Sequence, residues 1–200
     1  MKKIIIASIA TFVLSSCTLF PKNTDDNLNL SVSPTSNMVP VTSVITQSPT
    51  TTSKAGDTVV ALKTKDGQIV IKLFSQETPN TIKTFMSKVS SGFYNGLTFH
   101  RVIDGFMAQG GDPTGTGTGG GSQKSEINSI PFVRGSLGLA RTPVTKDISN
   151  DSQFFICFTT EGCQHLTGDY VNFGQVISGL DVLDKIRQGD KILEITANTK

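Results

Sequence analysis

Residues whose side chains could take part in binding or catalysis are concentrated between positions 99 and 113, in the run FHRVIDGFMAQGGDP. Arg101 is a permanently charged, planar donor with a rigid hydrogen-bonding geometry, which suits it to stabilise charge that develops during a reaction. A surface arginine in a strand is the alternative interpretation, which the apolar neighbours disfavour. His100 precedes Arg101 in a predicted strand and should point to the opposite side, so we interpret it as structural.

The glycine tract from Gly115 to Gly121 follows this run and formally contains the dinucleotide-binding pattern Gly-x-Gly-x-x-Gly. That pattern should join a strand directly to a helix, yet Asp112-Pro113 precedes the tract and a polar stretch without helical periodicity follows it. A phosphate-binding loop is excluded as well, because no Gly-Lys-Ser/Thr sequence ends the tract. We therefore interpret the tract as a tight loop.

The cysteines and histidines do not suggest a metal site, and no cofactor is expected. The two histidines, His100 and His165, have no second ligand nearby in the sequence. Cys157 lies in an apolar strand pattern, where a free cysteine usually behaves as a small hydrophobic side chain. We favour free thiols at Cys157 and Cys163; a disulfide between them, which an oxidising compartment permits, is the alternative.

The N-terminus has the pattern of an export signal over residues 1–16. A positive start, an apolar run over residues 4–14 and small residues before Cys17 indicate secretion, whereas a spanning helix would need about 20 apolar residues. The ending Leu14-Ser15-Ser16-Cys17 resembles the lipobox of bacterial lipoproteins, in which the cysteine is lipidated. This implies a location outside the cytoplasm, in the cell envelope, with a lipid anchor at Cys17. An ordinary signal peptide cut near the same place is the alternative.

Residues 17–56 are rich in Ser, Thr, Pro and Asn and show no sustained period of 2 or 3.6. Such a composition cannot bury enough apolar surface to offset its ordering entropy, so we predict a disordered tether with a reach of about 35 Å. The formal net charge of +2 is supplied by Lys2 and Lys3, and 2 − 2 = 0 remains without them. No nucleic-acid partner is expected from that balance.

The folded part is predicted over residues 57–197 and consists mainly of short strands. Two β-branched runs, 58–64 and 68–74, flank the Asp66-Gly67 pair and predict a hairpin. Thr78-Pro79 starts a helix that Gly92 ends, and a second helix fits residues 180–187. Further strands are expected at 97–102, 106–109, 136–140, 153–159, 171–176 and 192–196. This pattern favours a closed or nearly closed β-barrel with helical lids.

Three blocks in register resemble the cyclophilins. The first is the run at 99–113; the second combines residues 135–141 with SQFFI at 152–156; the third spans residues 166–174. The resemblance covers residues 57–196 and implies a mainly β fold, a closed eight-stranded antiparallel barrel capped by two α-helices. It also implies a shallow proline-binding groove on the outer face.

The resemblance implies peptidyl-prolyl cis/trans isomerase activity on proline-containing polypeptides, without covalent chemistry. The bond before proline rotates behind a barrier of about 18 to 20 kcal/mol. Lowering it needs an apolar pocket for the ring, anchors for the flanking backbone and a donor aimed at the imide nitrogen. The family's catalytic positions are matched by Arg101, Phe106 and Gln109, and its substrate-binding positions by Met107, Ala140, Arg141, Phe155, His165, Leu166 and Tyr170.

Three of these positions depart from common family residues. Arg141 replaces an asparagine, Tyr170 replaces a histidine, and His165 stands where cyclosporin-sensitive members carry a tryptophan. The leading expectation is a monomeric isomerase that assists the folding of exported proteins. The alternative is a non-catalytic proline-peptide-binding or chaperone module on the same scaffold, since a fold does not guarantee an activity.

Overall fold

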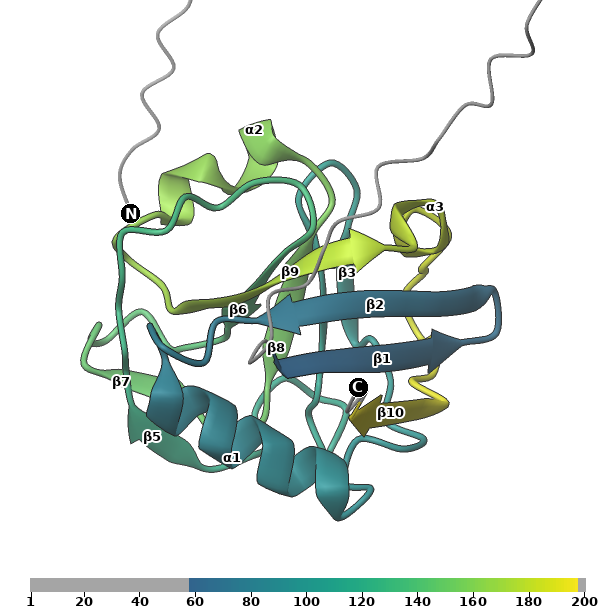
Figure 1. Cartoon of the computed structure of the whole chain (residues 1–200), viewed down its shortest axis with the longest axis horizontal. Helices are drawn as coiled ribbons and strands as arrows, with labels where there is room; N and C mark the ends of the chain where they lie inside the picture. Colours follow the sequence, from purple (N-terminus) through teal and green to yellow (C-terminus); the bar gives the residue numbers. More distant parts are fainter. Residues whose placement is uncertain (1–57, 198–200) are drawn as a thin grey trace, which may run out of the picture. The chain divides into compact units, whose positions relative to one another are not determined.

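The computed structural model describes residues 58–197 (Figure 1). The predicted signal peptide, Cys17 and the predicted tether lie outside the described residues. Within the described range no helix combines the length and the apolar character that a membrane crossing requires.

Ten strands, three α-helices and one 3₁₀ helix make up the described chain. They are β1 (Thr58–Thr64), β2 (Gly67–Leu73), α1 (Pro79–Ser90), β3 (Arg101–Ile103), β4 (Met107–Gly110), β5 (Ser122–Lys124), β6 (Ser136–Leu139), β7 (Ile148–Asn150), β8 (Phe154–Cys157), α2 (Thr160–Cys163), η1 (Gln164–Leu166), β9 (Asn172–Ser178), α3 (Leu180–Leu183) and β10 (Glu194–Ala197). The mainly β fold that the sequence predicts is confirmed.

Eight strands form one curled antiparallel sheet in the order β10-β1-β2-β9-β6-β8-β4-β3. Figure 1 shows β2 lying between β1 and β9. The sheet is open, with β10 and β3 at its edges, so a closed barrel is not observed. The residues that face each other across the gap lie outside both edge strands: Phe99 N donates to Asp190 O at 2.8 Å, and Ile192 N donates to Leu97 O at 2.8 Å. These loop contacts connect the two edges of the sheet, but β10 and β3 do not pair with each other as strands.

Helix α1 begins where the Thr78-Pro79 pair predicts. Its buried face carries Ile82, Phe85 and Val89, in the spacing of an amphipathic helix. Two backbone N–H groups of its first turn have no partner within the helix and bond to a distant residue instead. The Glu126 carboxylate accepts hydrogen bonds from the backbone of Asn80 and Thr81.

The second predicted helix is shorter than the sequence indicates. Helix α3 ends at Leu183 instead of reaching Arg187. Beyond it the backbone changes to tighter turns, in which Lys185 N donates to Val182 O and Ile186 N donates to Leu183 O. The apolar spacing that predicted a helix therefore also fits a chain of turns that buries Ile186.

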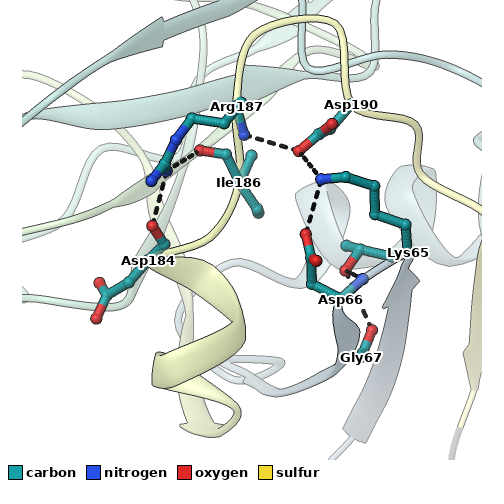
Figure 2. Close-up of polar contacts among 8 residues, drawn as sticks. Lys65, Asp66, Gly67, Asp184, Ile186, Arg187 and Asp190 are labelled. Atoms are coloured by element: carbon teal, nitrogen blue, oxygen red, sulfur yellow. Dashed lines mark hydrogen bonds and ion pairs between the residues drawn. The ribbon is translucent and has the colours of Figure 1, made fainter.

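The turn between β1 and β2 is tied to these turns by surface polar contacts (Figure 2). Lys65 Nζ lies 2.8 Å from a carboxylate oxygen of Asp66 and 2.8 Å from one of Asp190. Asp190 also accepts a hydrogen bond from the backbone of Arg187 at 2.8 Å. The hydrogen bond from Lys65 is the main reason that the pKa of Asp190 lies below its usual value. Exposed pairs of this kind contribute little stability each, about 0 to 1 kcal/mol.

The sheet separates two apolar clusters because side chains alternate along its strands. On β4 and β8, Ala108, Phe154 and Ile156 point into the main core, where the ring of Phe85 from α1 lies 6.1 Å from that of Phe154. The intervening residues Met107, Phe155 and Cys157 point to the opposite face. There they form the second cluster with Phe132, Cys163 and Leu166 from other segments, and Phe106 and Tyr170 pack against it. The second cluster thus lies on the outer face of the curled sheet.

The preference for free thiols at Cys157 and Cys163 is wrong. The two residues form a disulfide, with their Cα atoms 6.1 Å apart and both side chains fully buried. Cys157 ends β8 and Cys163 ends α2, whose first turn is fixed by a hydrogen bond from Gly162 N to the Thr159 hydroxyl. This short helix turns the chain back over the strand, which strand periodicity alone does not reveal.

Candidate active site

Three site residues form one row across three neighbouring strands. Arg101 on β3 lies directly opposite Gln109 on β4, and Gln109 lies directly opposite Phe155 on β8. Directly paired residues of antiparallel strands point to the same face of the sheet. The row therefore places a cation, an amide and an aromatic ring side by side on the outer face.

This row opens into a cavity of about 210 Å³. Its lining consists of Arg101, Phe106, Met107, Gln109, Ala140, Arg141, Phe155, His165, Leu166 and Tyr170. These ten residues are the ten catalytic and substrate-binding candidates that the sequence predicts. Residues from four separate stretches of the chain thus meet in one place.

Arg101 is exposed at the rim of the cavity and lies close to uncharged partners. Its Nη1 atom is 3.4 Å from Gln109 Oε1 and 3.9 Å from the sulfur of Met107. The first contact is long for a hydrogen bond, so most of the donor capacity of the guanidinium stays available for a ligand.

Gln109 is held by a residue that the sequence analysis did not single out. The amide nitrogen of Gln109 donates to Gln153 Oε1 at 2.9 Å, and the amide nitrogen of Gln153 donates to Gly119 O at 2.7 Å and Gly117 O at 3.2 Å. Gln153 is only 2% exposed. The signal available in the sequence was a glutamine directly before the apolar Phe154-Phe155-Ile156 run, because an amide drawn into a core by its neighbours needs partners.

Aromatic side chains form the walls of the cavity. The ring centroids of Phe106 and His165 are 5.7 Å apart, and those of Phe155 and Tyr170 are 5.8 Å apart in an edge-to-face arrangement. Beneath the cavity, Phe132 stacks on Phe155 with centroids 5.6 Å apart. Phe132 is the second residue that the sequence analysis missed, because it lies in a segment without strand or helix periodicity.

The side chain of Arg141, which stands where family members commonly carry an asparagine, is fixed against Tyr170. The guanidinium carbon lies 4.4 Å from the centroid of the Tyr170 ring, and Nε donates to Asp169 O at 3.0 Å. Stacking on an aromatic face and bonding to a carbonyl restrict the guanidinium to one place. Arg141 therefore forms a positively charged wall between this cavity and a second cavity beside it.

A second cavity of about 160 Å³ adjoins the first and shares Gln109, Ala140 and Arg141 with it. Its other lining residues are Gly117, Gly121, Ser122, Thr142, Ile148, Ser149, Asn150 and Gln153. The glycine tract thus borders this second cavity. The β5–β7 pair, which the sequence did not predict, supplies Ser122 and residues 148–150 of this lining.

The glycine tract is organised around Asp112, which is 1% exposed. Its carboxylate accepts hydrogen bonds from the backbone N–H groups of Thr114, Thr116 and Gly117. Burial acts to raise the pKa of Asp112, but these hydrogen bonds outweigh it and lower the pKa to about 2. The charged carboxylate therefore fixes the loop.

His100 lines neither cavity. Its ring lies under the glycine tract, near Gly117, and burial lowers its pKa below the usual value. This placement agrees with the prediction of a structural residue that points away from Arg101.

The arrangement is suited to non-covalent chemistry on an apolar ligand. An apolar pocket, a rim cation and an oriented amide can grip a small ring, hold its neighbouring backbone and donate hydrogen bonds to it.

The chain belongs to the cyclophilin-type peptidyl-prolyl cis-trans isomerase family, whose model matches residues 59–199. A peptidyl-prolyl cis-trans isomerase of Helicobacter pylori is 46% identical over 137 residues, which cover 66% of this chain and 81% of the relative. One of Synechococcus elongatus is 43% identical over 142 residues, covering 69% of this chain and 94% of the relative. The chain is thus a peptidyl-prolyl cis-trans isomerase.

A solved structure confirms the fold. The cyclophilin-type peptidyl-prolyl cis-trans isomerase of Cryptosporidium parvum superposes with a TM-score of 0.66 at 32% identity, covering 72% of this chain and 99% of that one. The same enzyme in the presence of the dipeptide Ala-Pro superposes with a TM-score of 0.65, also at 32% identity, covering 71% of this chain and 99% of that one.

Proposed function

We propose that the larger cavity binds the proline ring and that Arg101, Phe106 and Gln109 carry the catalysis. The observation that carries this proposal is the meeting of all ten predicted residues around one cavity on the outer face of the sheet. Phe106, Met107, Phe155 and Leu166 would contact the ring, and Gln109 would hydrogen-bond the substrate backbone. The backbone of Ala140 and Arg141 would pair with the residues beside the proline.

Arg101 would act on the electronic structure of the bond that rotates. The planar prolyl amide is stabilised by resonance, which is lost in the twisted transition state and returns electron density to the imide nitrogen. A guanidinium N–H aimed at that nitrogen binds the twisted amide more strongly than the planar one. Binding the transition state preferentially lowers the barrier by about 1.4 kcal/mol for each factor of ten in rate.

The test of this assignment is Arg101→Ala, measured as acceleration of cis-to-trans conversion in a proline tetrapeptide. We expect kcat/KM to fall by about 10²- to 10³-fold, the scale of removing one preorganised donor. Thermal stability should hardly change, because Arg101 is exposed. Arg187→Ala removes the same charge outside both cavities and should retain activity. Activity of Arg101→Ala within a few-fold of wild type would contradict the catalytic role.

We also propose that the protein is exported, monomeric and lipid-anchored at Cys17 in a bacterial cell envelope, where it assists the folding of exported proteins. Support comes from the sequence pattern of residues 1–16 and the Leu-Ser-Ser-Cys ending. Acyl chains contribute about 0.8 kcal/mol for each buried CH₂, so several chains on one residue give durable anchoring.

Detergent partitioning of cell extracts tests the anchor. Cys17→Ala should leave an unlipidated precursor that no longer partitions with the lipoproteins, because lipidation uses the sulfur. Ser36→Ala, a change of similar size in the predicted tether, should partition like wild type. Unchanged membrane retention of Cys17→Ala would overturn the anchor without affecting the assignment of the active site.

A further inference from the structure

The two adjoining cavities carry an unbalanced positive charge. Their combined lining includes two arginines, Arg101 and Arg141, and no carboxylate. Arg141 borders both cavities, so its charge faces a ligand in either.

Arg141 is held in place with part of its guanidinium unused. Nε donates to Asp169 O, and Nη1 donates to Thr142 O at 3.0 Å and to Thr145 O at 3.4 Å. Within the described part of the chain these bonds use Nε and Nη1 and leave the Nη2 hydrogens for a ligand or solvent. A cation already fixed by its surroundings loses little side-chain entropy on binding an anion.

Three carboxylates on the bordering loops have partners of their own, and a fourth, that of Asp147, is exposed beside the lining residue Ile148 without lining either cavity itself. Asp169 is paired with Lys146, whose hydrogen bond is the main cause of its lowered pKa, so the two charges offset each other. Asp151 lies 3.5 Å from Lys88 Nζ and accepts from Gly121 N. Asp112 is buried under the glycine tract and satisfied by backbone N–H groups. The Arg141 guanidinium also helps to lower the pKa of Asp169, so part of its charge is offset, but no carboxylate lines either cavity beside Arg101 and Arg141.

We propose that this isomerase selects proline segments with an acidic side chain within two residues of the proline, and that Arg141 is the residue that reads that side chain. The proposal rests on the binding of proline in the larger cavity. The second cavity shares three lining residues with the first. A side chain one or two residues away from the bound proline can therefore enter the second cavity. Glutamate there gains an ion pair, whereas lysine meets two like charges.

The test compares peptides that differ in one side chain. Glu, Gln or Lys is placed at each of the two positions before and after the proline, and cis/trans exchange is measured by NMR exchange spectroscopy. At low ionic strength we expect kcat/KM to be about five- to twentyfold higher for Glu than for Lys at the most responsive position. Added salt should reduce this ratio, because the side chains involved are solvent-accessible.

Variants locate the effect. Arg141→Gln should lower the Glu/Lys ratio by about threefold or more, and Arg141→Lys, which keeps the charge without the fork of donors, should give an intermediate ratio. Arg187→Gln removes the same charge from a residue that lines neither cavity and bonds the carbonyl oxygens of Asp184 and Ile186 (Figure 2). Its ratio should equal that of wild type.

The outcomes separate this proposal from the proposed function. Turnover of the Gln peptides with Glu/Lys ratios within twofold of one at every position would overturn the selectivity and leave the isomerase site intact. A wild-type ratio in Arg141→Gln would overturn the role of Arg141. Absence of turnover on every peptide would instead overturn the assignment of the site.

Discussion

Gln109 is oriented by a relay of amides that ends in the glycine tract. Gln153 accepts from Gln109 and donates to the carbonyl oxygens of Gly117 and Gly119. Because Gln153 is buried, all of its polar atoms must find partners in the protein. One residue thus fixes both the Gln109 amide, which we propose binds the substrate backbone, and the loop that borders the second cavity.

Gln153→Ala should impair both the stability of the protein and its isomerase activity. Two carbonyl oxygens and the Gln109 amide lose a partner, which should lower the free energy of unfolding by about 1 to 3 kcal/mol and kcat/KM by about tenfold. Urea unfolding and the tetrapeptide assay measure the two effects. Gln68→Ala, at an exposed position on β2, is the matched control and should change neither. Wild-type kcat/KM in Gln153→Ala would contradict the positioning role.

His165 is the residue expected to decide cyclosporin sensitivity. Its ring packs 5.7 Å from Phe106 at the cavity edge, where sensitive cyclophilins carry a tryptophan. A deficit of about 60 to 80 Å² of apolar area corresponds to about 1.5 to 2 kcal/mol. His165→Trp should therefore bind cyclosporin about ten- to thirtyfold more tightly than wild type, measured as inhibition relative to each protein's own uninhibited rate. Strong inhibition of wild type, or no gain in the variant, would contradict this expectation.

The packing of β6 against β8 requires a residue without a side chain at Gly138. Gly138 is paired with Phe155, and a Cβ atom at Gly138 would lie 2.2 Å from the Phe155 ring and 2.8 Å from the Phe132 ring. The two rings lie stacked over the strand only because this space is empty. A glycine inside a strand usually marks such a close approach.

Gly138→Ala should move the Phe155 ring and deform the larger cavity, which we propose binds proline. Overpacking of this kind costs about 1 to 3 kcal/mol, and kcat/KM should fall by at least about tenfold because the pocket wall is displaced. Thermal unfolding and the isomerase assay measure both. Adding Phe155→Leu to Gly138→Ala frees space and should restore part of the stability while activity stays low. A fully active Gly138→Ala protein would show that the contact does not shape the site.

The glycine tract should lose its anchor in acid. The pKa of Asp112 lies at about 2 in the folded protein, below its ordinary value of 3.8. A lowered pKa means that the stabilisation is complete above about pH 4 and is lost as the pH falls through the folded pKa near 2. Asp112→Asn should lower the free energy of unfolding by about 2 kcal/mol at neutral pH and by progressively less between pH 4 and 2.

Urea unfolding at a series of pH values provides the measurement. The difference between wild type and Asp112→Asn should shrink toward acid. Asp147→Asn removes a charge from an exposed position and should leave the acid limb of the wild-type curve in place. A constant difference at all pH values would show that the ionised carboxylate is not what fixes the loop.

Elements with strong local signals were predictable and those that depend on distant partners were not. The Asp66-Gly67 hairpin and α1 follow from turn chemistry, a proline at the first helical turn and apolar spacing. Strands β5 and β7 are short and polar, and only their pairing, Gln123 opposite Ser149, makes them strands. The disulfide depends on a turn of α2 that no periodicity encodes.

The clustering of the candidate site residues was predictable to a larger extent than these elements. All ten candidates line the larger cavity, because the three sequence blocks match the positions that the cyclophilin family uses. The blocks did not reveal the residues that hold the candidates in place, namely Gln153 beside Gln109 and Phe132 beneath Phe155. Nor did they reveal the position of the Arg141 side chain over the Tyr170 ring. Such supports arise from contacts between segments and have no local pattern.

The two ends of the described chain meet in the sheet. Strand β1 pairs with both β2 and β10, and Val60 lies opposite Ala197. The members of the main apolar cluster run from Val60 to Ile195. A chain with an intact β1 therefore contains every part of this core, whereas loss of β1 removes the strand that joins β10 to the rest of the sheet.

A fragment of residues 54–200 should fold alone and keep the activity of the full chain. It retains β1 and the whole described core, and the composition of residues 17–53 gives them too little apolar surface to add to it. We expect one cooperative unfolding transition within about 3 °C of that of the full chain, a shift that corresponds to well under 1 kcal/mol. A fragment of residues 66–200, which lacks β1, is the comparison and should fail to unfold cooperatively, because Val60 and Leu62 are fully buried in the core. Loss of the cooperative transition in the longer fragment would show that residues before 54 belong to the folded domain, whereas cooperative unfolding of the shorter one would show that the sheet does not need β1.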